Sequence, residues 1–152
     1  MFGMSRRQLR RIVDAEKVKA AIEEAERMTS GEVRVSVAHF FWGSVHRTAQ
    51  KAFTRMGMDR TQHRNGVLIF VVPSRRRFSI IGDEGIHQHV GQEFWEAVAA
   101  RLSENFQKGD FTEGLVEAVE EVGRRLKVHF PYTGEKDPNE IPDDVDFDGE
   151  KE

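Results

Sequence analysis

The sequence contains no cysteine, and this absence excludes several kinds of site at once. Disulfide bridges, thiolate zinc sites, iron–sulfur clusters and cysteine nucleophiles are all ruled out. Long apolar runs are also absent: the longest, Val67 to Val72, is far shorter than the roughly 20 residues of a membrane-spanning helix. The basic amino-terminal residues are followed by neither an apolar stretch nor a small-residue cleavage site, so we expect a cytoplasmic protein without a transmembrane segment.

Several catalytic motifs are missing as well. The chain has no G-x-S-x-G nucleophile elbow and neither of the phosphate-binding patterns G-x-G-x-x-G and G-x-x-x-x-G-K-[ST]. A serine hydrolase and a nucleotide-binding domain are therefore not indicated. Nucleic acid is not an expected partner either, because no recognisable nucleic-acid-binding motif is present and the charge of +4 on residues 1–130 is lower than a dedicated nucleic-acid binder usually carries.

The length and composition indicate one globular domain with an acidic tail. The chain has 152 residues, of which 38% are hydrophobic. Residues 131–152 hold nine Asp or Glu and carry a charge of −7, which leaves +4 on residues 1–130. We expect a folded domain over residues 1–130 and a largely disordered tail over 131–152. Docking of the tail onto the basic body is the alternative.

Periodicity predicts an alternation of helices and strands. The first helix begins near Ser5 or near Asp14 and buries one stripe between Val18 and Met28. The further expected elements are a strand over 32–38 with one face buried, a helix over 45–56, a central strand over 67–72, a returning strand over 78–81, and helices that begin near Gln92 and Asp110.

This order predicts an α/β fold, a three-layer α/β/α sandwich around a small mixed sheet. The strand–helix–strand unit is parallel and right-handed, and the turn after Val72 makes the next strand antiparallel as a hairpin. The starts of the first two strands and the end of the third then lie at one edge of the sheet.

Polar side chains gather at that predicted edge. Glu32 begins the first strand, Asp59, Arg64 and Asn65 lie in the loop before the second, and Asp83 and Glu84 follow the third. Carboxylate and amide oxygens are hard ligands that suit Ca²⁺ or Mg²⁺. Each residue also has an ordinary structural reading, as a solvated strand start or part of a turn.

Three other motifs have weaker interpretations. His87-Gln88-His89 would turn two rings the same way on an extended segment, but no third ligand stands at a defined spacing. Arg75-Arg76-Arg77 suits a phosphate or an anionic lipid, although a solvated hairpin turn explains it as well. Phe40-Phe41-Trp42 either anchors a partner or is buried under a helix.

Several blocks in the right order resemble the TPM-domain family. They are Thr29-Ser30-Gly31-Glu32-Val33-Arg34-Val35, Arg64-Asn65-Gly66-Val67-Leu68-Ile69, Gly82-Asp83-Glu84-Gly85-Ile86, and the F-x-x-G-x-F-x-x-G-L stretch from Phe106 to Leu115. The likeness runs from about residue 12 to 144, and its ending resembles the short bacterial branch of the family.

The resemblance implies an α/β/α fold, binding of Ca²⁺ or Mg²⁺, and a phosphatase label that comes from thylakoid relatives involved in photosystem repair. The chain departs from the exported and thylakoid branch at Gly91 and Gln92, where those relatives have a Thr-Asp pair.

Two functions follow from these residues. In the first, the chain is a binding or assembly module for membrane-protein maintenance: Glu32, Asp59, Asp83 and Glu84 hold the cation, which organises a surface for a protein partner. In the alternative, it is a metal-dependent acid phosphatase acting on phosphomonoesters, with Asp83 as the catalytic residue and Arg64 and Asn65 on the phosphate oxygens.

Overall fold

The structure is a computed structural model that describes residues 5–134 and 142–147. Two 3-10 turns, η1 (Met58–Arg60) and η2 (Pro73–Arg75), lie among its helices and strands. In chain order these are α1 (Arg6–Ile12), α2 (Ala15–Glu26), β1 (Glu32–Val37), α3 (Val45–Arg55), β2 (Gly66–Val72), β3 (Arg77–Gly82), α4 (Glu84–Gln107), α5 (Phe111–His129) and β4 (Asp146–Phe147).

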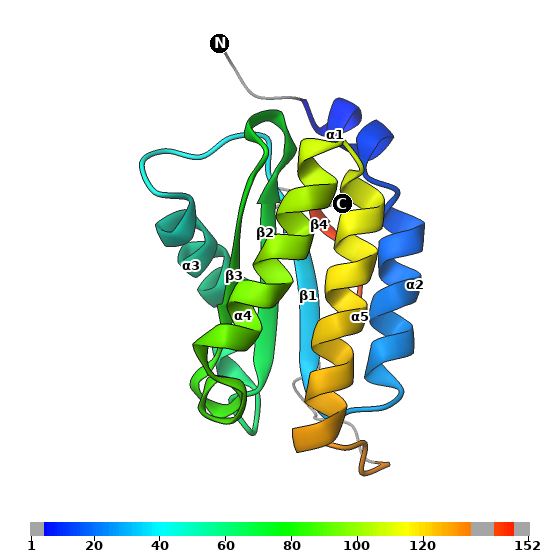
Figure 1. Ribbon diagram of the computed structural model, residues 1–152, viewed down its shortest axis with the longest axis vertical. Coiled ribbons are helices and arrows are strands. Elements are labelled where there is room, and N and C mark those ends of the chain that lie inside the picture. Colours follow the sequence, from blue (N-terminus) through cyan, green and yellow to red (C-terminus); the bar gives the residue numbers. More distant parts are fainter. Residues whose placement is uncertain (1–4, 135–141, 148–152) are drawn as a thin grey trace.

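The four strands form one mixed sheet in the order β3-β2-β1-β4 (Figure 1). β1 pairs in parallel with β2 and with β4, whereas β2 and β3 are antiparallel. The predicted parallel unit and the predicted hairpin are therefore confirmed. All seven residues of β2 are buried, as expected of a central strand covered on both faces.

Helices cover both faces of the sheet, which confirms the three-layer α/β/α sandwich. α2, α4 and α5 lie side by side on one face, and α3 lies on the other (Figure 1). Two apolar cores result. The larger contains Val33, Val35 and Ile69 with the three-helix layer, and the smaller contains Leu68 and Phe70 with α3. The strands thus divide their side chains between the cores with a period of two.

Both of the helix starts that the sequence offered are used. The Ser5 side chain caps α1 in a capping box with Gln8, and the Asp14 side chain caps α2 by accepting from the backbone N–H groups of Glu16 and Lys17. The two helices are separate because Val13, which lies between them with Asp14, is extended and fully buried.

No helix is expected from the sequence over residues 82–91, between the strand over 78–81 and the helix near Gln92, and this expectation is wrong. Asp83 caps a helix that already begins at Glu84, and Ile86 anchors this first segment in the core. The helical path is interrupted at Gly91, whose backbone angles are φ 73° and ψ 173°. The start expected near Gln92 is therefore the second segment of α4 after this kink.

Residues 142–147 dock on the body of the protein. This agrees, for these residues, with the alternative that the sequence analysis gave for the acidic tail. β4 pairs with β1 and Phe147 is buried at 2% exposure. Asp143, Asp144 and Asp146 form ion pairs with Arg34, Lys19 and Arg55 at 3.1, 3.0 and 2.8 Å. The expectation of disorder, which rested on composition alone, is wrong for this segment; residues 135–141 and 148–152 lie outside the described part of the chain.

Within the described residues, no helix is both long enough and apolar enough to cross a bilayer.

Candidate functional site

The three predicted segments do share one edge of the sheet. Glu32 lies opposite Gly66 in the parallel pair of β1 and β2, and the backbone N–H of Asp83 donates to the carbonyl oxygen of Gly66 at 3.0 Å. Glu32 and Asp83 therefore flank Gly66 from its two sides, roughly 10 Å apart by the spacing of strands. A Cβ on Gly66 would lie 2.9 Å from the carbonyl oxygen of Met58, so η1 fills the space above it.

Both oxygens of the Asp83 carboxylate, at this edge of the sheet, accept hydrogen bonds. Its Oδ1 accepts from the backbone N–H of Glu84 at 2.8 Å, which caps α4. Arg64 donates from Nε to Oδ2 at 2.7 Å and from Nη2 to Oδ1 at 2.8 Å, so the guanidinium binds both oxygens. The Asp83 side chain is 7% exposed and that of Arg64 is 45% exposed. Arg64 thus covers Asp83 from the solvent side.

Close backbone contacts fix the position of Arg64. Its φ is 51°, in the left-handed region, and its carbonyl oxygen accepts from the N–H of Gly85 at 2.8 Å. A Cβ on Gly85 would lie 2.2 Å from the carbonyl oxygen of His63 and 2.5 Å from that of Arg64. Only glycine lets the start of α4 approach this loop so closely.

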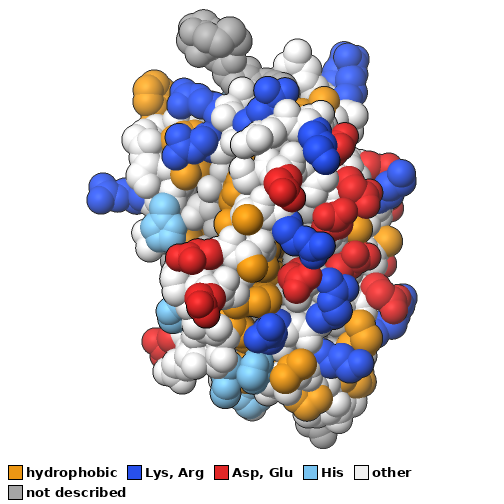
Figure 2. Space-filling model, viewed as in Figure 1, with side chains coloured by type: hydrophobic (Ala, Val, Ile, Leu, Met, Phe, Trp, Pro, Cys, Tyr) orange, Lys and Arg blue, Asp and Glu red, His pale blue; other side chains and the backbone are white. Residues whose placement is uncertain are grey.

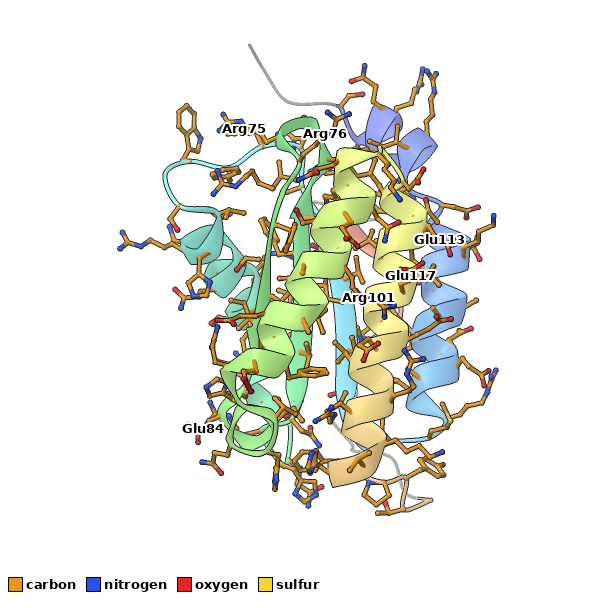
Figure 3. The ribbon with its side chains drawn as sticks, in the orientation of Figure 1. Arg75, Arg76, Glu84, Arg101, Glu113 and Glu117 are labelled. Carbon is orange, nitrogen blue, oxygen red and sulfur yellow. The ribbon has the colours of Figure 1, made fainter. Side chains whose placement is uncertain are left out.

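Two carboxylates contact the Arg64 guanidinium, and a third acts on it through its charge. Nη1 lies 3.7 Å from Oε1 of Glu84, which is an exposed side chain (Figure 3). Asp83 raises the pKa of Arg64 through its hydrogen bonds and its charge, and the charges of Glu84 and Asp59 raise it further. Asp83 and Glu84, at the start of α4, therefore contact one positive charge, and Asp59 of η1 adds its negative charge to the same region.

Two buried polar atoms of the site have no hydrogen-bond partner among the described residues. They are Oδ1 of Asp59 and Nδ2 of Asn65. The backbone of Asn65 is fully engaged: its N–H donates to Oγ1 of Thr61 at 3.1 Å, and its carbonyl oxygen accepts from the N–H of Glu32 at 3.4 Å. A buried carboxylate oxygen without a donor is costly, and a bound ligand would remove that cost.

Glu32 belongs to a different cluster. Its Oε1 accepts from Nη2 of Arg34 at 3.1 Å, and Arg34 also pairs with Glu26 and with Asp143. Arg34 is fully buried. Burial raises the pKa of Glu26 to about 7, against the charge and hydrogen bond of Arg34, which lower it, while Asp143 adds to the increase.

Sequence reasoning missed this cluster because it assigned Arg34 to an uncovered face of the strand. All six residues of β1 are buried, so the expectation of one buried face is wrong. The cover comes from the segment that carries Asp143, more than a hundred residues away, and no local pattern announces it.

The histidine pair does not converge. Nδ1 of His87 accepts from Nε1 of Trp95 at 2.9 Å, whereas the His89 ring stacks on His129 with 4.6 Å between centroids. Both residues lie on the first segment of α4, where positions two apart face different directions. The segment is helical and not extended, so the arrangement in which both rings face one way does not form.

The donor set fits a hard cation in part. No group of three or more His, Asp or Glu within residues 5–134 and 142–147 is placed to hold a metal ion as the side chains stand. Asp59, Asp83 and Glu84 nevertheless carry the oxygen ligands that Ca²⁺ and Mg²⁺ prefer. One buried oxygen of Asp59 has no hydrogen-bond partner within the described residues.

A model of the TPM domain matches residues 12–125. The NMR structure of the BA42 protein from the psychrophilic bacterium Bizionia argentinensis is 34% identical, with a TM-score of 0.80, and the match covers 88% of this chain and 91% of that chain. The N-terminal domain of the cg2496 protein from Corynebacterium glutamicum is 18% identical, with a TM-score of 0.55 over 72% of this chain and 68% of that chain, a likeness of fold alone. No curated protein matches.

Proposed function

The chain belongs to the TPM domain family, and from that premise we propose that it is a binding module for a divalent cation, Ca²⁺ or Mg²⁺. The cation binds at Asp59, Asp83 and Glu84 and competes with the guanidinium of Arg64 for them. Binding changes the surface formed by the loop before β2 and the start of α4, and that surface serves a protein partner in membrane-protein maintenance.

The observation that carries this proposal is the position of Arg64. Its guanidinium is held 2.7 Å from one carboxylate and 3.7 Å from a second, and Asp59 adds to the negative potential there. Carboxylates arranged around one positive charge also suit a second kind of cation, and hard divalent ions bind the same oxygens. The half-exposed side chain of Arg64 has room to swing into solvent.

The proposal leaves Glu32 outside the ligand set. Its carboxylate is buried at 7% side-chain exposure and pairs with Arg34, which is itself fully buried. Removing one partner from a buried ion pair leaves an uncompensated charge, which costs several kcal/mol, about 3 to 5. A cation at the edge of the sheet would have to offset that cost before it could use Glu32.

Binding is favoured over hydrolysis because a cation needs only the carboxylate oxygens. Hydrolysis also needs a general acid or an activated nucleophile, and the sequence shows no motif for one. Arg64, the residue expected to orient a phosphate, is held by its contact with Asp83. Phosphomonoester hydrolysis is the alternative function, and the assay described below decides between the two.

The test is an amide NMR titration with CaCl₂ and with MgCl₂. In the unaltered chain, shifts should concentrate in residues 59–65, which precede β2, and in residues 82–93, which span the end of β3 and the first part of α4. Asp83→Asn should abolish them. Arg64→Gln should tighten binding by about tenfold, because it removes the competing charge. Asp110→Asn is the matched control, since Asp110 precedes α5 without a side-chain cap bond and should change nothing.

Three results would contradict the proposal. They are an absence of shifts with either ion, shifts that survive Asp83→Asn, and weaker binding by Arg64→Gln. An assay with a generic aryl phosphate runs beside the titration. Turnover that requires the added cation and disappears in Asp83→Asn would replace the binding function with hydrolysis.

A further inference from the structure

The charged side chains of this chain are unevenly distributed between its layers. Residues 33–82 contain nine Lys or Arg and a single acidic residue, Asp59. These residues form β1, α3, β2, β3 and their connections. Figure 2 shows many acidic side chains over α2, α4 and α5, with Lys and Arg among them, and further Lys and Arg at the upper end of the molecule. The α3 side is therefore the basic side of an overall acidic chain.

Two loops form one surface at the end of the sheet opposite the cation site. The hairpin turn Arg75-Arg76-Arg77 lies beside the loop that follows β1, because Oγ of Ser74 donates to the carbonyl oxygen of His39 at 3.1 Å. The guanidinium carbons of Arg75 and Arg77 lie 4.9 and 5.9 Å from the centre of the Phe41 ring. Figure 3 labels Arg75 and Arg76 at this upper end.

Trp42 extends from the same loop into solvent. Its side chain is 83% exposed, and the ring meets Phe40 edge-on with 5.5 Å between centroids. Of the two interpretations of the aromatic segment, burial therefore holds for Phe41 at 6% exposure and exposure holds for Trp42. An exposed indole costs free energy in water, and that cost is removed when the ring enters an apolar or interfacial environment.

Five basic side chains on this side form no ion pair within the described residues, although Arg75 and Arg77 lie near the Phe41 ring. Arg47 and Lys51 are exposed and stand four residues apart on α3, so they share one side of that helix. Among the residues that the structure describes, neither they nor the three arginines of the hairpin turn form an ion pair. Arg64, Arg34 and Arg55, in contrast, each contact a carboxylate.

We propose that this basic-aromatic surface, formed by Trp42, Arg47, Lys51 and Arg75–Arg77, binds an anionic lipid bilayer. The Trp42 ring lies at the level of the headgroups, where amphipathic aromatic rings are most stable, and the arginines contact lipid phosphates. The acidic layer of α2, α4 and α5 lies on the far side of the sheet, so it is not pressed against the anionic surface.

A bilayer fits this surface better than a nucleic acid does. Proteins that bind single strands stack successive bases on several aromatic rings along a basic groove. Here only one ring of the segment is open to solvent, since Phe40 is half-buried and Phe41 is buried. A single indole among arginines matches the composition of a membrane interface instead.

The test measures binding to phosphatidylcholine vesicles with and without about 30% phosphatidylglycerol, at low and at high salt. The unaltered chain should sediment with the anionic vesicles only, and less so as salt rises. Replacing Arg75, Arg76 and Arg77 by Gln, Asn and Gln should weaken binding on the order of 100-fold, at about fivefold per charge. Asn is used at position 76 because it tolerates the positive φ of 51° found there. Trp42→Ala should weaken binding about tenfold.

The matched control removes three positive charges from the acidic layer. Arg101, Arg124 and Lys127 are exposed residues of α4 and α5, and replacing all three by Gln should leave vesicle binding unchanged. Circular dichroism and the thermal midpoint verify that each variant is folded.

Quenching of tryptophan fluorescence by brominated lipids reports the depth of Trp42. The other tryptophan, Trp95, is 8% exposed and lies in the core, so it contributes little to the quenched signal. Quenching should occur with anionic vesicles and be lost in Trp42→Phe. The proposal is overturned if anionic vesicles are not bound at low salt, if the control triple variant loses as much binding as the hairpin variant, or if an oligonucleotide is bound more tightly than the vesicles.

Discussion

The guanidinium of Arg34, on β1, is buried and forms ion pairs with three carboxylates. Glu26, Glu32 and Asp143 would carry three negative charges against one positive charge if all were ionised. Burial favours the neutral form of a carboxyl group, and it raises the pKa of Glu26 to about 7. This carboxyl group therefore keeps its proton over a range in which an exposed glutamate has lost it.

This protonation makes stability depend on pH. The pKa of Glu26 is 4.5 in the unfolded chain and about 7 in the folded one, so its contribution is complete below pH 4.5 and is lost as the pH rises through 7. The loss amounts to about 3 kcal/mol. Urea unfolding of the unaltered chain and of Glu26→Gln between these pH values measures it: the stability advantage of the unaltered chain should fall as pH rises. Parallel pH curves for the two proteins would contradict the assignment.

At the scale of the elements, α4 combines a helix start at the site with a break that positions it. Asp83 caps the first segment, and Gly91 separates that segment from the long second one. The backbone of Gly91, with φ 73° and ψ 173°, lies in a region open almost only to glycine. The break directs the start of α4, with Asp83 and Glu84, toward the loop that carries Arg64.

The Gly91→Ala variant tests this break, because the change in the free energy of unfolding should have the opposite sign to that expected in a regular helix. In a regular helix interior the change would stabilise the protein by about 1 kcal/mol. At Gly91 it should destabilise by about 1 to 3 kcal/mol and shift the resonances of the Arg64–Asp83 pair, because the side chain strains the turn. Ser103→Ala, in the regular part of α4, is the control and should be nearly neutral. A stabilised Gly91→Ala variant would show that the helix runs on without a break.

β4 is the shortest element, yet it closes the free edge of β1. Phe147 contributes a ring that is 2% exposed, and the guanidinium carbon of Arg10 lies 4.3 Å from the ring centre. Phe147→Ala should cost about 3 kcal/mol in the free energy of unfolding, as for a buried ring. Tyr132→Ala, at a ring 45% exposed, should cost much less. An equal and small effect of both changes in urea unfolding would mean that residues 142–147 are not docked.

At the scale of the whole molecule, the fold could be predicted because its signals are local. Val33, Val35 and Val37 alternate, Val67–Val72 is continuously apolar, and the helices repeat their apolar residues at helical spacing. The shared edge of the sheet followed from connection rules alone. The same rules predicted that Asp83 and Arg64 lie near each other at this edge of the sheet.

The composition of the candidate site could not be predicted in the same way. Which carboxylate an arginine binds depends on side-chain contacts between distant segments. Glu32 is held by Arg34 because Asp143 and its neighbours cover that face, and Asp83 is held by Arg64 because Gly85 permits a very close approach. Neither of these two ion pairs produces a periodic pattern in the sequence from which it could be predicted.

The measurement that tests the central claim most directly follows the Nε–H group of Arg64 by NMR during a calcium titration. In the free protein this N–H donates to Oδ2 of Asp83 at 2.7 Å, which should shift its resonance and slow its exchange with water. If the cation displaces the guanidinium, the resonance should move toward that of a solvent-exposed arginine in parallel with the amide shifts of residues 82–93. A resonance that stays in place at saturating calcium, while those amides shift, would contradict the account.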